Sequence, residues 1–280
     1  FSKSVARTLL AKIYAEKPLR DYTKVIQYCD EVKADGFDLV DDFSDLFGMN
    51  AAGTDAKMRN TKESILEAQF TSGAGNWCTW MFGRDLVNWN NNFTWAKWVT
   101  PSRDLISTFK QEGDEVRFKE SIVYYDCNWS NYYPSDNYPF MYKCRSANSS
   151  IIKYRYADVL LLKAEALIMQ DTPDLEGAAD IIDEVRDRAK LGALPTSVRS
   201  NKNVLLNALL KERRLELAFE GQRWFDLVRL DKVEEVMNAV YAKDSGRKAQ
   251  IYTFDKNSYR LPIPQSVIDA NDKIHQNPGY

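Results

Sequence analysis

The chain has 280 residues, with 38 lysines and arginines against 40 aspartates and glutamates, so its formal net charge at pH 7 is −2. The charges are spread along the sequence without a long run of either sign, which argues against a nucleic-acid-binding protein, because such a protein neutralises phosphates with a basic face. No stretch reaches the roughly 18 uninterrupted apolar residues of a membrane-spanning helix, and the single histidine, His275, excludes a histidine-rich metal site and leaves one candidate member for a Ser-His-Asp triad.

The first 63 residues predict a pair of helices. In residues 4–16 and again in residues 21–33, apolar side chains recur three or four positions apart, which is the spacing of one helix face. The short link at 17–20 predicts that the two helices pack antiparallel. The pattern Leu10-Ala11-x-x-Tyr14 is similar to the first helix of a tetratricopeptide repeat (TPR), in which a small residue lets the partner helix approach, although no repeat period follows.

The middle of the chain, residues 64–152, has a different composition. Residues 65–70 predict a strand, and the only helical pattern beyond it lies near residues 101–110. Six of the seven tryptophans lie between positions 76 and 142. This segment therefore reads as irregular, with aromatic-rich loops and short strands.

Helical patterns return in the C-terminal part of the chain. Helices are predicted by the apolar spacing at residues 153–170, 174–191, 203–219 and 233–241, with a further short helix that ends near Leu230. An extended segment at 259–263 and a coil tail follow.

The four cysteines are Cys29, Cys78, Cys127 and Cys144. None of them forms a CxxC pair, so a structural zinc site is not expected. Cys127 and Cys144 bracket a loop and could pair in an oxidising compartment, or both could remain free thiols.

Five stretches carry a family signal. They read YRYADVLLLKAEA at 154–166, VRDRA at 185–189, ERRLELAFEGQRWFDL at 212–227, LPIPQ at 261–265 and QNPGY at 276–280. Together they resemble the SusD/RagB family of outer-membrane nutrient-binding lipoproteins. The resemblance implies a mainly α, SusD-like fold with TPR-like helical pairs and an irregular insertion of aromatic-rich loops and short strands.

The resemblance also implies how the chain is organised. It predicts one domain fragment over 1–280, composed of a TPR-like helical pair and loop at 1–63, the aromatic-rich segment at 64–152 and the C-terminal helical region at 153–280. Family members are longer and begin with a signal peptide, a lipidated cysteine and an N-terminal helical region, so we expect roughly the first two fifths of the protein to be missing here.

The function implied by the resemblance is polysaccharide utilisation. A surface-exposed lipoprotein, held on the outer membrane by an N-terminal lipid anchor absent from this chain, would capture an oligosaccharide or polysaccharide for a SusC-like TonB-dependent transporter. No cofactor, metal or nucleic acid is expected. Two alternatives stay open: a helical-repeat scaffold that binds other proteins, and a peptide-binding RagB-like protein.

The charged residues of 212–227 recur at spacings of three and four. This spacing predicts ion pairs along helices or with Arg155, Asp158, Glu165, Arg186 and Arg188 on facing helices. The alternative is a catalytic carboxylate cluster, but nothing in the stretch supplies a nucleophile or a metal site. We therefore interpret the signature as scaffold.

A glycan site is predicted in the aromatic-rich segment. An exposed tryptophan or tyrosine offers a flat apolar surface to the C–H face of a sugar ring, and neighbouring Asn, Asp or Arg side chains can bind its hydroxyl groups. Residues 88–98 and 128–138 combine both kinds of side chain. The predicted ligand-binding residues are Trp77, Trp89, Asn91, Trp95, Trp129, Tyr132 and Tyr133.

This segment has two other interpretations. Many of its rings could pack inward, and Trp80, Phe93 and Trp98 are the leading candidates for the core. A glycoside hydrolase would need two carboxylates roughly 5–10 Å apart, and no motif pairs two acids here. The sequence therefore predicts a binding protein, not an enzyme.

Overall fold

The computed structural model describes residues 2–71, 75–76, 78, 100–127, 130–243 and 253–280. Contacts group the chain into two compact units, Phe1–Arg223 and Trp224–Tyr280, each of which is described by itself. Helices predominate and the strands are short, which confirms the predicted mainly α fold. The predicted division at residues 63 and 152 stays a prediction.

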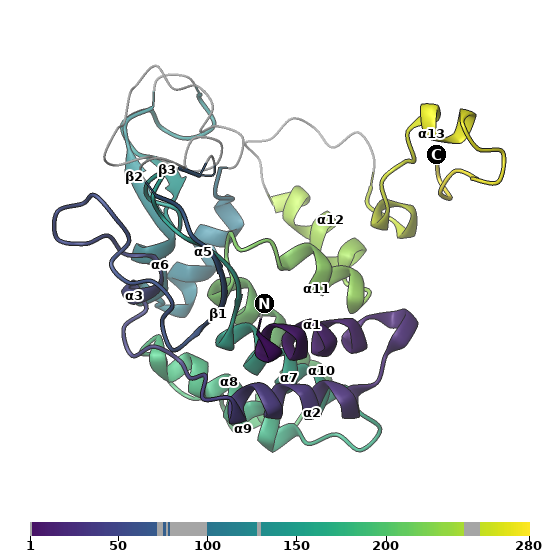
Figure 1. The fold of residues 1–280 in the computed structure, drawn as a ribbon, viewed down its shortest axis with the longest axis horizontal. Coiled ribbons are helices and arrows are strands. Elements are labelled where there is room, and N and C mark those ends of the chain that lie inside the picture. The colour runs from purple at the N-terminus through teal and green to yellow at the C-terminus, as the bar shows by residue number, and fades with distance from the viewer. Residues whose placement is uncertain (1, 72–74, 77, 79–99, 128–129, 244–252) are drawn as a thin grey trace. The chain divides into compact units, whose positions relative to one another are not determined.

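The N-terminal helical pair is confirmed. Helix α1 spans Lys3–Ala15, a 3₁₀ turn η1 spans Lys17–Leu19, and α2 spans Tyr22–Ala34. Side-chain oxygens of Ser2 and Asp21 cap the two helices by accepting hydrogen bonds from backbone N–H groups. The helices lie side by side (Figure 1), and α1 buries small residues such as Ala11 and Ala15, which allow α2 to approach closely.

Helix α7 (Tyr156–Met169) forms the centre of the first unit. It packs against α1 and α2, which precede it in the chain, and against α8 (Leu175–Arg188) and α10 (Lys202–Glu216), which follow it (Figure 1). Nearly every residue of α7 is buried, as its apolar composition on all sides requires. A short helix α9 (Thr196–Arg199) precedes α10.

Among the described residues of this unit there are two small antiparallel sheets. Strand β1 (Ser64–Ala68) pairs with β4 (Ile151–Arg155), and β2 (Ile122–Tyr125) pairs with β3 (Tyr138–Met141). The prediction that a helix begins at residue 153 is therefore wrong, because residues 151–155 form the second strand of a sheet and α7 begins at Tyr156.

Three further helices lie before or beside these strands: α3 (Ser44–Phe47), α5 (Arg103–Glu112) and α6 (Glu115–Ser121). Leu105, Ile106 and Phe109 of α5 pack with Ile122 of β2 and Leu215 of α10 in one buried apolar cluster. This cluster fixes the start of α5 next to the β2–β3 hairpin, where the aromatic side chains gather.

The second unit contains α11 (Arg223–Arg229), α12 (Val233–Lys243), a 3₁₀ turn η3 (Lys256–Tyr259) and α13 (Gln265–Asp269). The η3 turn is tied to α12 by the Tyr259 hydroxyl, which donates to Glu234 over 2.6 Å. The extended segment predicted at 259–263 begins one residue too early, because Tyr259 is the last residue of η3 and Arg260 is the first extended residue. In the part of the chain described, no helix is long and apolar enough to cross a membrane.

Candidate functional site

A cleft of about 460 Å³ lies between α5 and the β2–β3 hairpin. Helix α5 contributes Arg103, Lys110 and Gln111, and the hairpin contributes Tyr124 and, from its connecting loop, Tyr133 with its neighbours. The cleft thus combines aromatic rings with cationic and amide side chains, which is the composition that the sequence predicted for a glycan site.

Arg103 organises the aromatic rings at this cleft. Ser102 caps α5 by accepting a hydrogen bond from the Leu105 N–H over 3.1 Å, so Arg103 is the first residue of the helix. Its guanidinium carbon lies 4.1 Å from the centre of the Tyr132 ring and 4.5 Å from that of Tyr133, within the range of a cation–π contact. The guanidinium also donates a hydrogen bond to the Tyr132 carbonyl.

Tyr132 and Tyr133 form a rigid pair. Their ring centres lie 4.9 Å apart with the planes at 88°, an edge-to-face arrangement. The Tyr133 hydroxyl donates to the Pro101 carbonyl over 2.7 Å, and its ring also meets the buried Tyr138 edge-on. Both members of the pair are half-buried, so each residue is anchored by these contacts and still partly exposed.

Of the predicted binding residues, Tyr133 lines the cleft, and Tyr132 packs edge-to-face against it and contacts the cleft residue Arg103. The other five predicted residues lie outside the described part of the chain, so their role stays a prediction; they are Trp77, Trp89, Asn91, Trp95 and Trp129. The rings expected in the core, Trp80, Phe93 and Trp98, also lie outside it.

Sequence reasoning missed the α5 side of the cleft. Arg103, Lys110 and Gln111 carry no aromatic or asparagine-rich signal of their own, and they reach the site only because α5 packs against the hairpin. The sequence signal that could have indicated Arg103 is its place directly after the N-cap Ser102, at a helix start close to the aromatic segments.

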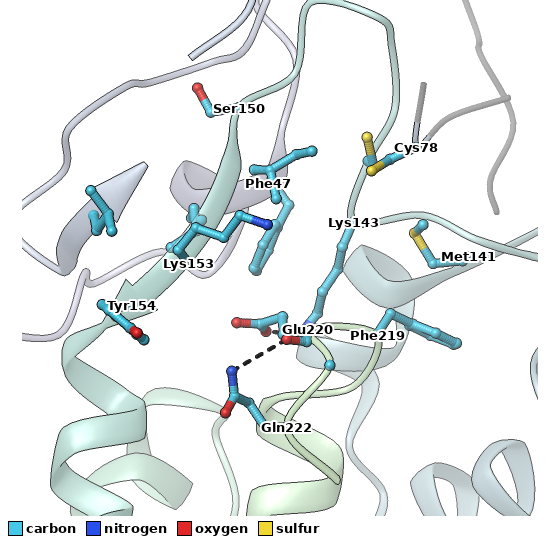
Figure 2. Close-up of a pocket in the computed structure, with 15 residues that line it drawn as sticks. Phe47, Cys78, Met141, Lys143, Ser150, Lys153, Tyr154, Phe219, Glu220 and Gln222 are labelled. Carbon is cyan, nitrogen blue, oxygen red and sulfur yellow. Dashed lines mark hydrogen bonds and ion pairs between the residues drawn. The ribbon is translucent and has the colours of Figure 1, made fainter. Parts of the chain in front are cut away.

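A second cavity of about 510 Å³ lies between β4 and the turn that follows α10 (Figure 2). Its wall is mostly apolar, with Phe47, Met141 and Phe219 among the larger side chains. In Figure 2 the Lys143 side chain extends toward Glu220, to whose carboxylate it donates over 2.6 Å. Burial lowers the pKa of Lys143 to about 8, against the attraction of Glu220.

Glu220 also connects this cavity to a buried ion network that includes charged residues of the family signature. The Glu216 carboxylate accepts hydrogen bonds from Arg155 Nη1 over 2.5 Å, from Arg117 Nη1 over 3.1 Å and from Arg188. Arg155 Nη1 also donates to Glu63 over 2.7 Å. Burial alone would raise the pKa of Glu216, but the three guanidinium groups outweigh it and hold that pKa well below its usual range.

A second buried group joins three helices. Asp158 of α7 accepts from Lys12 Nζ of α1 over 2.6 Å and from Arg213 Nη2 of α10 over 2.7 Å. Together with the contact of 3.2 Å between Arg186 and Glu212, these pairs confirm that the signature charges hold facing helices together. The carboxylates form ion pairs with arginine and lysine side chains inside the protein. The geometry therefore supports the scaffold interpretation of the signature.

The Asp158 group predicts a specific acid sensitivity. Burial would raise the pKa of Asp158, but Lys12 and Arg213 lower it below its ordinary value. Because the folded-state pKa lies below the unfolded value of about 3.9, this stabilisation is fully present above about pH 5 and is lost as the pH falls through the folded-state pKa. We expect Asp158→Asn to lower the free energy of unfolding at pH 7 and to flatten its decline between about pH 5 and pH 2.

Urea unfolding at a series of pH values measures this effect. Asp41→Asn is the matched control, since the Asp41 side chain is 98% exposed and pairs with Lys62 at the surface, and its profile should follow that of the parent protein. An Asp158→Asn profile as steep as the parent profile would contradict the prediction.

Comparison with known proteins agrees with this fold and this signature. The SusD family model matches residues 136–280, and the chain belongs to the SusD family. SusD-like protein P38 of Formosa agariphila is 43% identical over 99 residues, which cover 33% of this chain and 19% of the relative. SusD-like protein P2 of the same organism is 36% identical over 143 residues, which cover 49% and 27%.

Solved structures share the fold over the whole chain. A SusD homolog from Bacteroides thetaiotaomicron superposes with a TM-score of 0.75 at 23% identity, covering 100% of this chain and 64% of that one. A laminarin-binding SusD-like protein gives 0.71 at 24% identity, with 100% and 63% covered. Surface glycan-binding protein A from Bacteroides thetaiotaomicron gives 0.73 at 19% identity, with 99% and 64% covered. The chain thus spans less than two thirds of the length of these proteins.

Proposed function

We propose that this chain is part of a glycan-binding protein, and that the cleft between α5 and the β2–β3 hairpin contributes to its binding surface. The observation that carries the proposal is the half-buried pair Tyr132 and Tyr133, held edge-to-face beside Arg103. The anchored rings present apolar surface to the C–H face of a sugar at little entropic cost. One of the similar structures is a laminarin-binding SusD-like protein and another is a surface glycan-binding protein, which supports the same class of ligand.

Within this proposal the sugar hydroxyl groups are bound by polar side chains around the rings. Lys110 and Gln111 lie along the α5 wall, and Asn137 lies across from them. Trp89, Asn91, Trp95, Trp129 and Trp77 complete the proposed set on sequence grounds. The protein holds its ligand without cleaving it.

Calorimetric titration of the protein with a panel of polysaccharides tests the proposal, with laminarin as the first probe because a similar structure is described as binding it. We expect saturable binding to at least one member of the panel and no release of reducing ends during the incubation. Failure of the full-length protein to bind any glycan would overturn the proposal, and release of reducing ends by pure protein would favour a hydrolase instead.

The proposal extends to the whole protein. We infer a surface-exposed lipoprotein of the outer membrane that passes its glycan to a SusC-like TonB-dependent transporter. Co-purification of the full-length protein with such a transporter from solubilised outer membranes is the expected result. Recovery of the full-length protein in a soluble fraction, without a transporter, would contradict this part of the proposal while leaving glycan binding intact.

A protein-binding scaffold is the second candidate function, and one observation favours it. Leu9, Ile13 and Leu19 of α1 and η1 are large apolar side chains that are exposed. If these exposed apolar residues bind other proteins, the double variant Leu9→Ser/Ile13→Ser would abolish co-purification with protein partners. Tyr132→Ala would then leave nutrient uptake unchanged. A peptide-binding RagB-like activity would instead appear as binding of peptides, in place of glycans, by the same calorimetric titration.

A further inference from the structure

Two cysteines line the same cavity, the one shown in Figure 2. The side-chain oxygen of Asn76 accepts a hydrogen bond from the Cys144 thiol over 3.3 Å and from the Cys78 backbone N–H over 3.1 Å. Cys78 and Cys144 thus meet at the same oxygen atom, Cys78 through its backbone N–H and Cys144 through its thiol. All four cysteines of the chain are free thiols in this structure, and these two are neighbours.

Asn76 fixes the approach of the two backbones. This residue is buried, and its amide group donates to the carbonyls of Ser146, Ala147 and Ser149 over 3.2, 3.1 and 2.8 Å. Its own backbone N–H donates to Ala147 over 2.8 Å. At Gly75 a Cβ atom would lie 2.9 Å from the Ala147 Cβ, so only glycine permits this close contact. These hydrogen bonds hold Asn76, and through it the backbone N–H of Cys78, beside the segment that follows Cys144.

Cys78 has the environment of an attacking thiol. The hydrogen bond with Cys144 and the charge of Lys153 lower the pKa of Cys78 to about 7, although partial burial opposes the shift. In contrast, burial raises the pKa of the Cys29 thiol well above its ordinary value. Cys127 is buried in a separate cluster with Tyr138 and Phe140. A thiolate reacts with disulfides and a thiol does not, so Cys78 is the reactive member of the four.

We propose that Cys78 and Cys144 form a reversible disulfide by exchange with an external disulfide oxidant. The Cys78 thiolate attacks one sulfur of the oxidant, a mixed disulfide forms, and the first oxidant thiolate leaves. Cys144 then loses its proton and attacks the Cys78 sulfur, which releases the second oxidant thiolate. The two protein thiols are oxidised by two electrons, the oxidant disulfide is reduced to two thiols, and both protons end on the released thiolates or in water.

The proposed disulfide would enclose most of the aromatic-rich segment in one covalent loop. The closed loop from Cys78 to Cys144 contains residues 88–98 and 128–138, the two segments that combine aromatic and asparagine side chains. A disulfide here would link the two ends of this loop covalently. Closing a loop reduces the conformational freedom of the unfolded chain, which stabilises the folded state. The pair Cys127 and Cys144, which the sequence suggested, would have enclosed only the second of these segments.

Peptide mapping tests the proposal. The protein is incubated in its native state with excess glutathione disulfide at pH 8, free thiols are blocked with N-ethylmaleimide after denaturation, and the unreduced digest is analysed by mass spectrometry. We expect the Cys78 and Cys144 peptides to be joined with the loss of two hydrogen atoms, and Cys29 and Cys127 to be alkylated. Alkylation of both Cys78 and Cys144, glutathione retained on Cys78, or a bond between any other pair would overturn it.

Two variants test the pairing of Cys78 with Cys144, and a rate measurement on the native protein tests the reactivity of Cys78. Cys29→Ser/Cys127→Ser keeps only the proposed pair and should form the same bond, whereas Cys78→Ser should form no intramolecular bond. In the reduced native protein at pH 7, iodoacetamide should modify Cys78 at least about tenfold faster than Cys29 or Cys127. Equal rates for the three thiols would contradict the assignment of Cys78, and the wild-type map decides the pairing if a variant fails to fold.

A thermal melt supplies a readout of the cross-link itself. We expect the midpoint of thermal unfolding to be higher for the oxidised protein than for the same sample after dithiothreitol, and Cys78→Ser to show no such difference. If the midpoint of thermal unfolding were the same before and after reduction of the mapped disulfide, the proposed stabilisation by the cross-link would be contradicted. None of these measurements uses a glycan, so the outcome is separate from that of the proposed function.

Discussion

Glu216→Gln is expected to lower the free energy of unfolding by about 3–5 kcal/mol, the cost of breaking a buried ion pair by removing one partner. The Glu216 side chain has no solvent exposure and lies among Arg117, Arg155 and Arg188. Glutamine keeps the size and shape of the side chain but removes its charge. The three guanidinium groups would then share fewer buried carboxylates, which leaves positive charge inside the protein without full compensation.

Urea denaturation is the appropriate measurement, because guanidinium chloride would itself screen charges. Glu176→Gln is the matched control: Glu176 pairs with Arg199 on the surface, its side chain is 71% exposed, and such pairs contribute about 0–1 kcal/mol. If Glu216→Gln shifted the urea midpoint no further than Glu176→Gln does, the network would not be a major source of stability.

A double variant separates the charge effect from simple loss of packing. Glu216→Gln combined with Arg188→Met removes one positive charge along with the negative one. We expect the pair to lose less stability than the sum of the two single variants, because contacting members of one network couple by about 0.5–3 kcal/mol. Strict additivity would mean that Arg188 and Glu216, although hydrogen-bonded, do not depend on each other.

The long helices of this fold could be predicted from local sequence. The predicted ranges 4–16 and 21–33 correspond to Lys3–Ala15 and Tyr22–Ala34, and 203–219 corresponds to Lys202–Glu216. Each of these helices buries one face, so the apolar spacing alone reports it. The caps at Ser2 and Asp21 act within the first turn of each helix and are equally local.

The strand predicted at residues 65–70 is confirmed as β1 (Ser64–Ala68), whereas β2, β3 and β4 could not be predicted in the same way. Residues 153–155, the last three of β4, read as the start of a helix because they run directly into the apolar residues of α7. Their extended conformation depends on hydrogen bonds to Ser64–Ala68, a partner far away in the sequence. Strands β2 and β3 similarly stabilise each other across the loop that contains Tyr132 and Tyr133.

In the candidate site, too, some residues could be predicted from local sequence, whereas others depend on contacts between distant segments. Composition indicated Tyr132 and Tyr133, since clustered aromatic and polar residues are visible in one stretch of sequence. The cation that stacks on both rings, Arg103, comes from another element, and its place there follows from the packing of α5 against β2 and α10. In the same way, spacing alone suggested Cys127 as the partner of Cys144, whereas the hydrogen bonds of Asn76 place Cys78 there.

Tyr132→Ala is expected to weaken glycan binding by about 1–2 kcal/mol, or about 5–30-fold in Kd, if the ring carries a sugar on its accessible face. Tyr132 is preferable to Tyr133 as the site of mutation. The Tyr133 hydroxyl is bonded to the Pro101 carbonyl and its ring packs on buried Tyr138, so its loss would also disturb the core. Tyr132 is half-buried and contacts Arg103 and Tyr133 at the edge of the cleft.

Calorimetric titration with the glycan that the parent protein binds gives the Kd of each variant. Tyr132→Phe is the control: it retains the flat ring and the contact with Arg103, so its Kd should stay within about twofold of the parent value, because stacking on the ring face does not require the hydroxyl. Thermal unfolding midpoints of the three proteins show whether the cleft remains folded. A Tyr132→Ala protein that is folded and binds the glycan with the parent Kd would remove this cleft from the binding surface. The proposed site would then rest on Trp89 and Trp129, for which Trp89→Ala and Trp129→Ala are the corresponding tests.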